Sequence, residues 1–153
     1  MFSDDKPHEE CGIVGAYIPE ENVAQTLFFG LFALQHRGQE SAGIATSKGE
    51  RIGIKAKMGL VSQVFREETL SGLPGHLGIG HTRYSTMGGS KEYNAQPLLA
   101  NGQRGQIAVG HNGNVINAAD LRIELAEEFG ATFNKTSDTE VIAELFAKAP
   151  GAN

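Results

Sequence analysis

Cys11 is the residue best suited to covalent chemistry, and it is the only cysteine in the 153-residue chain. It follows the charged decapeptide 1–10 and opens an apolar, β-branched stretch. If the bond between Glu10 and Cys11 were cut, the thiol would gain an α-amino group on its own residue, with a reference pKa of about 7.7–8.0. Such an amine can take the proton of the thiol, so an N-terminal nucleophile needs no separate histidine base. The alternative is a small, buried and unreactive cysteine.

Arg83 stands near the end of a predicted strand, 77–84, within the segment GHTRYSTMGG at 80–89. Its planar guanidinium can hold a carboxylate through two parallel hydrogen bonds. Gly88 and Gly89 in the loop behind it are suited to be hinges of a lid that closes over a substrate. The alternative is a surface arginine that forms an ion pair, followed by a simple connection.

The segment HNGN at 111–114 offers two neighbouring hydrogen-bond donors. Asn112 has a side-chain amide, and Gly113 has a backbone N–H that no Cβ shields. Two such donors at the end of a strand can stabilise the oxyanion of a tetrahedral intermediate. Because Asn-Gly is also the commonest sequence of a tight turn, a plain β-turn remains the alternative.

Asp138 occupies the first helical position in the segment SDTEV at 137–141, where Ser137 and Glu140 fit a capping box. A carboxylate at this position interacts favourably with the helix dipole, which explains it without any further function. It can also bind an ammonium group. Arg83 and Asp138 together would then recognise the two charges on the head group of a free amino acid.

Gly38 follows a predicted cationic helix end in the segment LQHRGQESAG at 34–43. It either ends the helix in a left-handed conformation or lets the backbone approach a substrate. His81 and His111 precede Arg83 and the HNGN segment, and we expect them to be packed or hydrogen-bonded residues beside the site rather than catalysts. The spacing of the His, Asp and Glu residues indicates no metal site.

The hydrophobic pattern predicts strands separated by turns, with the helices grouped rather than alternating with the strands. Strands are predicted at 11–18, 42–47, 51–57, 77–84, 97–100 and 106–111. Helices are predicted from Asn22 to about residue 36, over 118–129, and from Ser137 to about residue 148. The stretch 61–70 has no clear pattern, and 85–95 is predicted as a long loop. This order favours a layered α+β fold over a doubly wound parallel sheet.

Composition excludes several classes of function. The net charge is −5 and Lys and Arg form no cluster, which argues against a nucleic-acid-binding protein. No apolar run is long enough to cross a membrane, and residues 1–10 lack the apolar segment of a secretory signal. A single cysteine excludes an internal disulfide and a multi-cysteine metal site, and we expect a cytoplasmic protein.

Five segments in this order resemble those of one enzyme family: CGIVG at 11–15, LQHRGQESAG, GHTRYST, HNGN and SDTEV. They are similar to the segments of the glutaminase domain in the amidophosphoribosyltransferase family, which belongs to the class II glutamine amidotransferases. The resemblance implies an N-terminal-nucleophile hydrolase fold, an αββα sandwich of two sheets between helical layers. It also implies that residues 1–10 are a propeptide and that 11–153 are the N-terminal portion of the domain, truncated at its C-terminal side.

The resemblance implies catalytic roles for three residues. Cys11 would be the nucleophile with its α-amine as general base, while Asn112 and Gly113 would stabilise the oxyanion. Attack on the side-chain amide of glutamine would release ammonia and leave a glutamyl thioester, which water would hydrolyse to glutamate.

Four further residues would bind glutamine according to the same resemblance. Arg83 would bind its α-carboxylate and Asp138 its α-ammonium group. Gly38 and Thr86 would border the substrate. No metal ion or cofactor is expected in this chain.

The resemblance also implies partners outside the chain. A phosphoribosyltransferase domain, expected to be absent here, binds phosphoribosyl pyrophosphate with Mg²⁺ in this family. It uses the ammonia to make phosphoribosylamine, the first step of de novo purine biosynthesis. Some members also hold a 4Fe–4S cluster, whose ligands would lie beyond residue 153. The full-length protein is expected to be a homo-oligomer.

Two other interpretations remain open. A related class II amidotransferase, such as glucosamine-6-phosphate synthase, generally begins with cysteine directly after the initiator methionine, so the decapeptide and LQHRGQESAG speak against it. The third interpretation is a fragment that folds and binds glutamine or a partner chain without turnover. A chain that starts at Cys11 would support the enzyme, whereas retained residues 1–10 would leave a blocked precursor.

Overall fold

Helices and strands are described for residues 11–84, 91–103 and 105–148 in the computed structural model. The strands are β1 (Gly12–Tyr17), β2 (Ser41–Ser47), β3 (Ile52–Met58), β4 (Leu77–Arg83), β5 (Leu98–Gly102) and β6 (Gly105–Val109). The α-helices are α1 (Ala24–Ala33), α2 (Val61–Val64), α3 (Glu67–Ser71), α4 (Ala118–Phe129) and α5 (Asp138–Lys148), and the short 3-10 helices are η1 (Gln35–Arg37) and η2 (Glu92–Asn94). Gly88 and Gly89, the predicted hinges, lie outside the described residues.

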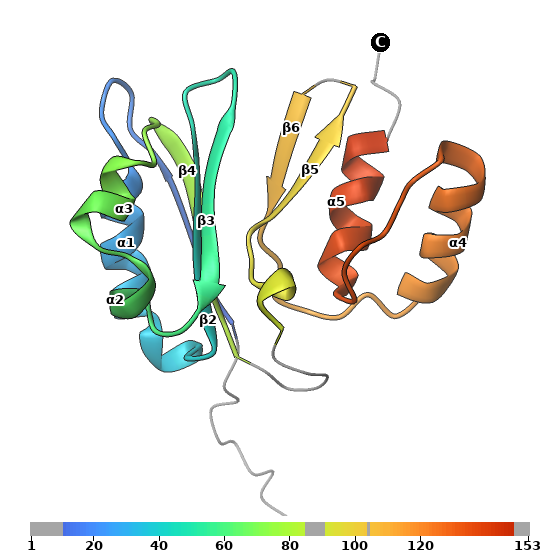
Figure 1. The fold of residues 1–153 in the computed structure, drawn as a ribbon, viewed down its shortest axis with the longest axis horizontal. Helices are drawn as coiled ribbons and strands as arrows, with labels where there is room; N and C mark the ends of the chain where they lie inside the picture. Colours follow the sequence, from blue (N-terminus) through green and yellow to red (C-terminus); the bar gives the residue numbers. More distant parts are fainter. Residues whose placement is uncertain (1–10, 85–90, 104, 149–153) are drawn as a thin grey trace, which may run out of the picture.

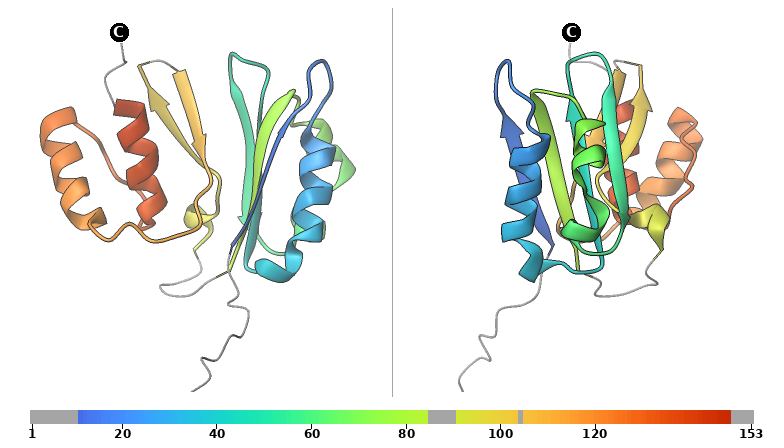
Figure 2. Two further views of the ribbon diagram at one scale, coloured as in Figure 1. Left: turned by 180° about the vertical axis from the view of Figure 1, so that it is seen from behind. Right: turned by 60° about the vertical axis from the view of Figure 1, so that its left-hand side comes forward.

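The strands form two antiparallel sheets that face each other. Strands β1, β4, β2 and β3 lie side by side in this order, and β5 pairs with β6 in a hairpin. Helices α1, α2 and α3 cover the outer face of the four-stranded sheet, while α5 packs on the hairpin and α4 lies outside α5 (Figure 1 and Figure 2). Every strand pair in the described ranges is antiparallel, which confirms the predicted α+β class.

An apolar cluster between α1 and the four-stranded sheet fixes the strands that carry predicted site residues. Val23, Leu27 and Leu31 from the helical side and Ala42 and Ile44 from β2 are fully buried. Complete burial of one such large side chain stabilises the fold by roughly 1.5–3 kcal/mol. The cluster therefore holds α1 firmly against β1, β4 and β2.

The first helix is shorter than the sequence predicts, because η1 replaces its last turn. The predicted cap Asn22 lies one residue before the N-cap position, which Val23 occupies, but it accepts a hydrogen bond from the amide of Ala24 at 3.0 Å. At the other end, the side chain of Gln35 accepts a hydrogen bond from the amide of Val61 and donates one to the carbonyl of Gly38. These bonds tie the helix end to α2 and to the loop before β2.

Two regions without a predicted helix are partly helical. The stretch 61–70 contains α2 and most of α3, and η2 lies inside the predicted loop 85–95. Each of these helices has five residues or fewer. A helical hydrophobic pattern needs a window of about 11–18 residues, so the sequence pattern could not indicate such short helices.

The capping box predicted at the start of α5 forms only in part. The hydroxyl of Ser137 accepts a hydrogen bond from the amide of Thr139 at 3.2 Å. The carboxylate of Glu140 instead accepts hydrogen bonds from the amides of Asn134 and Lys135, at 2.8 Å and 3.0 Å. Glu140 therefore orders the loop before α5 rather than the first turn of the helix.

Gly43 in β2 allows the segment before β5 to lie directly on the four-stranded sheet. A Cβ atom at this position would overlap the carbonyl oxygen of Gln96 and would lie 2.8 Å from the Cβ of Ala56. The close contact between these two parts of the fold therefore depends on the missing side chain.

The variant Gly43→Ala should have a free energy of unfolding about 1–3 kcal/mol lower than the unchanged chain, because the added methyl group overpacks this contact. Urea denaturation measures the difference. Gly15→Ala is the matched control: Gly15 also lies in a strand, but a Cβ there has no atom within 4 Å. The control should change the stability by less than about 0.5 kcal/mol. Equal stability of the two variants would show that the contact does not depend on Gly43.

Candidate active site

Cys11 and Arg83 lie at the same end of the four-stranded sheet. Strand β1 pairs with β4 so that Gly12 stands opposite Thr82, and Cys11 immediately precedes this pair. The Sγ atom of Cys11 lies 4.0 Å from the carbonyl oxygen of Tyr84, the residue that follows β4. The predicted nucleophile is partly exposed and stands beside the strand end that carries Arg83.

The loop before β2 lies on the same strand end. The amide of Glu40 donates a hydrogen bond to the carbonyl of Arg83 at 3.1 Å. A Cβ atom at Gly38 would lie 2.7 Å from the carbonyl carbons of Thr82 and Arg83, so this approach requires glycine. Gly38 has an extended backbone with φ −157°, and the alternative of a left-handed helix end is therefore wrong.

Arg83 is mostly buried, unlike the surface ion-pair residue of the alternative interpretation. Its side chain is 16% exposed, and its Nε atom lies 4.0 Å from a carboxylate oxygen of Glu40. Its Nη1 atom donates to the carbonyl of Asn94 at 3.4 Å. Both carboxylate oxygens of Glu40 are buried without a hydrogen-bond partner among the described residues. The guanidinium of Arg83 is therefore the cation that offsets this buried carboxylate.

Arg83 and Asp138 line one pocket, although they are far apart in the sequence. The pocket has a volume of about 620 Å³ and lies between the end of β4, η2, the loop before α4 and the start of α5. Its wall also includes Lys91, Asn94 and Arg122. The structure thus brings the two predicted head-group residues together.

Asp138 joins the start of α5 to the loop after β6. One of its carboxylate oxygens accepts a hydrogen bond from the amide of Val115 at 2.8 Å, and the other lies 3.9 Å from Nδ1 of His111. The side chain is 22% exposed. As the first residue of α5, it also meets the positive end of the helix dipole. Asp138 therefore has a structural contact in addition to its place in the pocket.

The HNGN loop presents the predicted oxyanion donors. The amide of His111 donates to Oε1 of Gln96 at 2.7 Å, and the carbonyl of His111 accepts from Nε2 of His81 at 3.1 Å. Asn112 and Gly113 follow this anchored residue and are exposed. Gly113 has φ +153°, a backbone angle that favours glycine. The loop is therefore held at its first residue, with both predicted donors beyond that point.

His81 is a buried neutral histidine beside the site. Burial lowers the pKa of His81 from its ordinary value of 6.5 to about 4, the hydrogen bond to His111 raises it, and the nearby charge of Arg83 lowers it. Because a neutral ring that donates through Nε2 has its proton there, Nδ1 is left as an acceptor. This arrangement confirms the expectation that His81 is a hydrogen-bonded residue beside the site.

Two buried polar residues before β5 contact the site, although no role was predicted for them. Asn94 is 2% exposed and donates from its side chain to the hydroxyl of Thr136 at 2.9 Å. Gln96 is 6% exposed and bonds to His111. In the sequence, these two residues could have been noticed as polar side chains that directly precede a predicted apolar strand. Thr86, predicted to border the substrate, lies outside the described residues.

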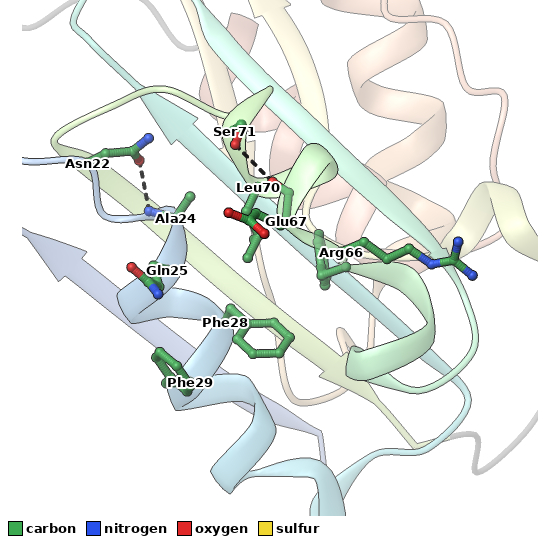
Figure 3. Close-up of a pocket in the computed structure, with 10 residues that line it drawn as sticks. Asn22, Ala24, Gln25, Phe28, Phe29, Arg66, Glu67, Leu70 and Ser71 are labelled. Carbon is green, nitrogen blue, oxygen red and sulfur yellow. Dashed lines mark hydrogen bonds between the residues drawn. The ribbon is translucent and has the colours of Figure 1, made fainter.

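A second pocket lies on the outer side of the four-stranded sheet, between α1 and α3 (Figure 3). It has a volume of about 530 Å³, with Phe28, Phe29 and Leu70 on its apolar side and Arg66 and Glu67 on its polar side. It contains none of the residues that the sequence predicts for the site. The pocket that Arg83 and Asp138 line is therefore the candidate substrate site, because it contains predicted site residues.

The described part of the chain contains neither a cluster of metal-binding side chains nor a membrane-spanning helix. There, no group of three or more His, Cys, Asp or Glu side chains is arranged to hold a metal ion. None of the helices in the same ranges is both long and apolar enough to cross a membrane.

Known proteins match this chain in sequence. Residues 81–153 match the family model of the glutamine amidotransferase domain. The amidophosphoribosyltransferase of Synechocystis sp. is 52% identical over 143 residues, which cover 94% of this chain and 29% of that protein. The amidophosphoribosyltransferase of Methanocaldococcus jannaschii is 51% identical over 139 residues, which cover 90% of this chain and 29% of that protein.

Solved structures match it as well. The glutamine phosphoribosylpyrophosphate amidotransferase from B. subtilis, complexed with ADP and GMP, has a TM-score of 0.79 and 39% identity over 92% of this chain and 30% of that chain. The structure of an allosteric regulatory enzyme of purine biosynthesis has a TM-score of 0.81 and 42% identity, with the same coverage of 92% and 30%.

The comparisons agree: residues 81–153 match a glutamine amidotransferase domain, and nearly the whole chain is similar to one part of amidophosphoribosyltransferases. The chain spans less than a third of the length of the relatives it matches. The residues that line the pocket of Arg83 and Asp138 all lie within the matched residues 81–153.

The free energy of unfolding should fall as the pH drops from 6.5 toward 4, because His81 takes up a proton in the unfolded chain but not in the folded one. The pKa of His81 is lower in the folded chain than in the unfolded chain. The contribution of His81 to the free energy of unfolding is therefore fully present above pH 6.5 and is lost as the pH falls toward 4. One pKa unit corresponds to about 1.4 kcal/mol, so the loss reaches about 3 kcal/mol. Urea denaturation at a series of pH values measures it.

The control for this prediction is His81→Gln, which keeps an N–H donor for the carbonyl of His111 but cannot titrate. Its stability should lack the part of the pH dependence that His81 contributes. The same slope in both proteins would assign the acid sensitivity to other groups.

Proposed function

We propose that this protein hydrolyses the side-chain amide of glutamine in the pocket beside Cys11. The observation that carries the proposal is the pocket that Arg83 and Asp138 share. A guanidinium and a carboxylate in one pocket complement the α-carboxylate and α-ammonium groups of a free amino acid. The match of residues 81–153 to the glutamine amidotransferase domain supports the amide of glutamine as the reacting group.

In this proposal, the head group of glutamine is held at both of its charges. The guanidinium of Arg83 forms charge-assisted hydrogen bonds with the α-carboxylate, which are stronger than neutral ones. The carboxylate of Asp138 binds the α-ammonium group. Gly38, whose backbone lies against the end of β4, and Thr86 are proposed as further residues at the border of the substrate.

The chemistry proposed for Cys11 starts with removal of residues 1–10. The freed α-amine takes the proton of the thiol, and the thiolate attacks the amide carbon of glutamine to form a tetrahedral intermediate. The side-chain amide of Asn112 and the backbone N–H of Gly113 stabilise its oxyanion. Collapse of the intermediate transfers the proton to the leaving nitrogen, breaks the C–N bond and releases ammonia. Water then hydrolyses the glutamyl thioester to glutamate and restores the thiol.

The proposed role of the whole protein is the first step of de novo purine biosynthesis, in which the ammonia reacts with phosphoribosyl pyrophosphate to give phosphoribosylamine. The names of the relatives support this role. Phosphoribosyl pyrophosphate and Mg²⁺ would be bound outside residues 11–153. Where a 4Fe–4S cluster occurs, it needs four thiolates, which the single Cys11 does not provide.

Three further features complete the proposal. Residues 11–153 are proposed to be the N-terminal portion of an N-terminal-nucleophile hydrolase domain with an αββα arrangement, and the two facing sheets between helices support it. The full-length protein is proposed to be a homo-oligomer. A cytoplasmic location is supported by the reduced thiol that the chemistry requires.

Cys11→Ser should reduce the release of ammonia from glutamine by about 10³-fold or more, because the hydroxyl is a far weaker nucleophile than a thiolate near neutral pH. The midpoint of urea unfolding should stay close to that of the unchanged protein, since the two side chains differ little in size. The assay compares both proteins after intact mass has shown that they begin at residue 11. A serine variant with the ordinary rate would exclude Cys11 as the nucleophile.

Arg83→Lys should raise the glutamine concentration at half-saturation at least about tenfold, because a hydrogen bond to a charged group contributes about 1.5–3 kcal/mol and the two-pronged geometry is lost. Steady-state kinetics with glutamine measures this. Lys91→Gln is the matched control, because Lys91 lines the same pocket and loses its charge in the variant. If the control had the larger effect, general electrostatic attraction rather than Arg83 would select the substrate.

A further inference from the structure

We propose that Gln96 positions the HNGN loop and, through it, the oxyanion donors, a role that rests on the function proposed above. Gln96 lies between η2 and β5 and is 6% exposed. Its Oε1 atom accepts a hydrogen bond from the amide of His111 at 2.7 Å. Its Nε2 atom donates to the hydroxyl of Thr139 at 3.0 Å. One side-chain amide therefore joins the HNGN loop to α5, at the residue next to Asp138.

The backbone of Gln96 is itself fixed on the four-stranded sheet. Its carbonyl oxygen lies where a side chain at Gly43 would be, so β2 and the Gln96 backbone are in close contact. The same sheet has Cys11 and Arg83 at its end. Gln96 thus connects the part of the site that carries the nucleophile with the part that carries the oxyanion donors and Asp138.

The two bonds of Gln96 require both an acceptor and a donor at this place. His111 offers an N–H, which only an acceptor satisfies, and Thr139 is fully buried, so its hydroxyl depends on protein partners. An amide supplies both functions without a charge. When Gln96 is replaced by an apolar residue, the backbone of His111 keeps only the hydrogen bond from His81 among the residues that the structure describes. The positions of Asn112 and Gly113, the proposed oxyanion donors, are then less well fixed.

The test uses the mature full-length protein and measures kcat and KM for glutamine in Gln96→Met. We expect kcat to fall about tenfold or more, up to the 10²–10³-fold loss that follows removal of one oxyanion donor. KM should change by less than about threefold, because the bond that is lost stabilises the transition state through the loop and not the bound substrate. A rise in KM with unchanged kcat overturns the proposal.

Gln106→Met is the matched control, because the side-chain amide of Gln106 also joins two elements, in this case β6 and β3. Its Oε1 atom accepts from the amide of Ile52 at 2.9 Å, at the end of β3 remote from Arg83. This variant loses a similar bridge but should keep the kcat of the unchanged protein. An equal loss of kcat in both variants would mean that the loss of any side-chain amide contact between two elements lowers activity, and the proposal fails.

A double-variant comparison with Asn112→Ala separates this proposal from the proposed function. If Gln96 acts through the HNGN loop, adding Gln96→Met to Asn112→Ala lowers kcat by a clearly smaller factor than Gln96→Met does alone, because only the displacement of Gly113 is left to lower it. Losses that multiply overturn the role of Gln96 and leave the oxyanion role of Asn112 intact. An unchanged kcat in Asn112→Ala alone overturns the proposed oxyanion donors and the role of Gln96 together.

Two conservative variants keep the test decisive if Gln96→Met does not fold. Gln96→Glu retains an acceptor for His111 and should retain kcat within a few-fold, since the hydroxyl of Thr139 can turn to donate. Gln96→Asn is one methylene shorter, cannot reach both partners, and should show the loss of kcat. Equal kcat in these two variants overturns the proposal.

Discussion

Two hydrogen bonds on the backbone of His111 join the parts of the candidate site. Its amide bonds to Gln96 and its carbonyl bonds to His81, and both partners are buried. A buried polar group that loses its partner costs about 1–3 kcal/mol, so the chain after His111 is held at a defined place beside β4. Strand β4 also carries Arg83 and pairs with β1, the strand that Cys11 precedes. It therefore contacts the HNGN loop, carries the arginine and lies beside the proposed nucleophile.

The charges around the pocket follow from the same packing. Burial keeps His81 neutral near pH 7, so it adds no positive charge next to Arg83. The carboxylate of Glu40 lies behind Arg83, and the guanidinium of Arg122 is engaged by the carbonyl of Ser137 at 2.7 Å. Among the cations of this pocket, Arg83 is therefore the one that is both largely buried and placed at the strand end beside Cys11.

The elements with a long and regular pattern could be predicted from the sequence, as the helix at 118–129 and the strand that ends in Arg83 show. The positions of Cys11 and Arg83 could also be inferred, because both stand at strand ends that the local pattern defines. The roles of Gln96 and Gly43 could not, since their partners lie in other elements and only the folded chain brings them together. Local periodicity contains no information on such contacts, nor on helices of five residues or fewer.

In the proposed reaction, the thiol of Cys11, at the start of the mature chain, attacks the amide carbon of glutamine. A glutamine analogue with an electrophilic carbon in place of that amide tests it most directly, by mass mapping of the modified residue in the mature full-length protein. We expect one adduct, on the Sγ of Cys11, and protection from labelling by excess glutamine. An adduct on another residue, or labelling of a chain that still carries residues 1–10 at the same rate, would contradict it.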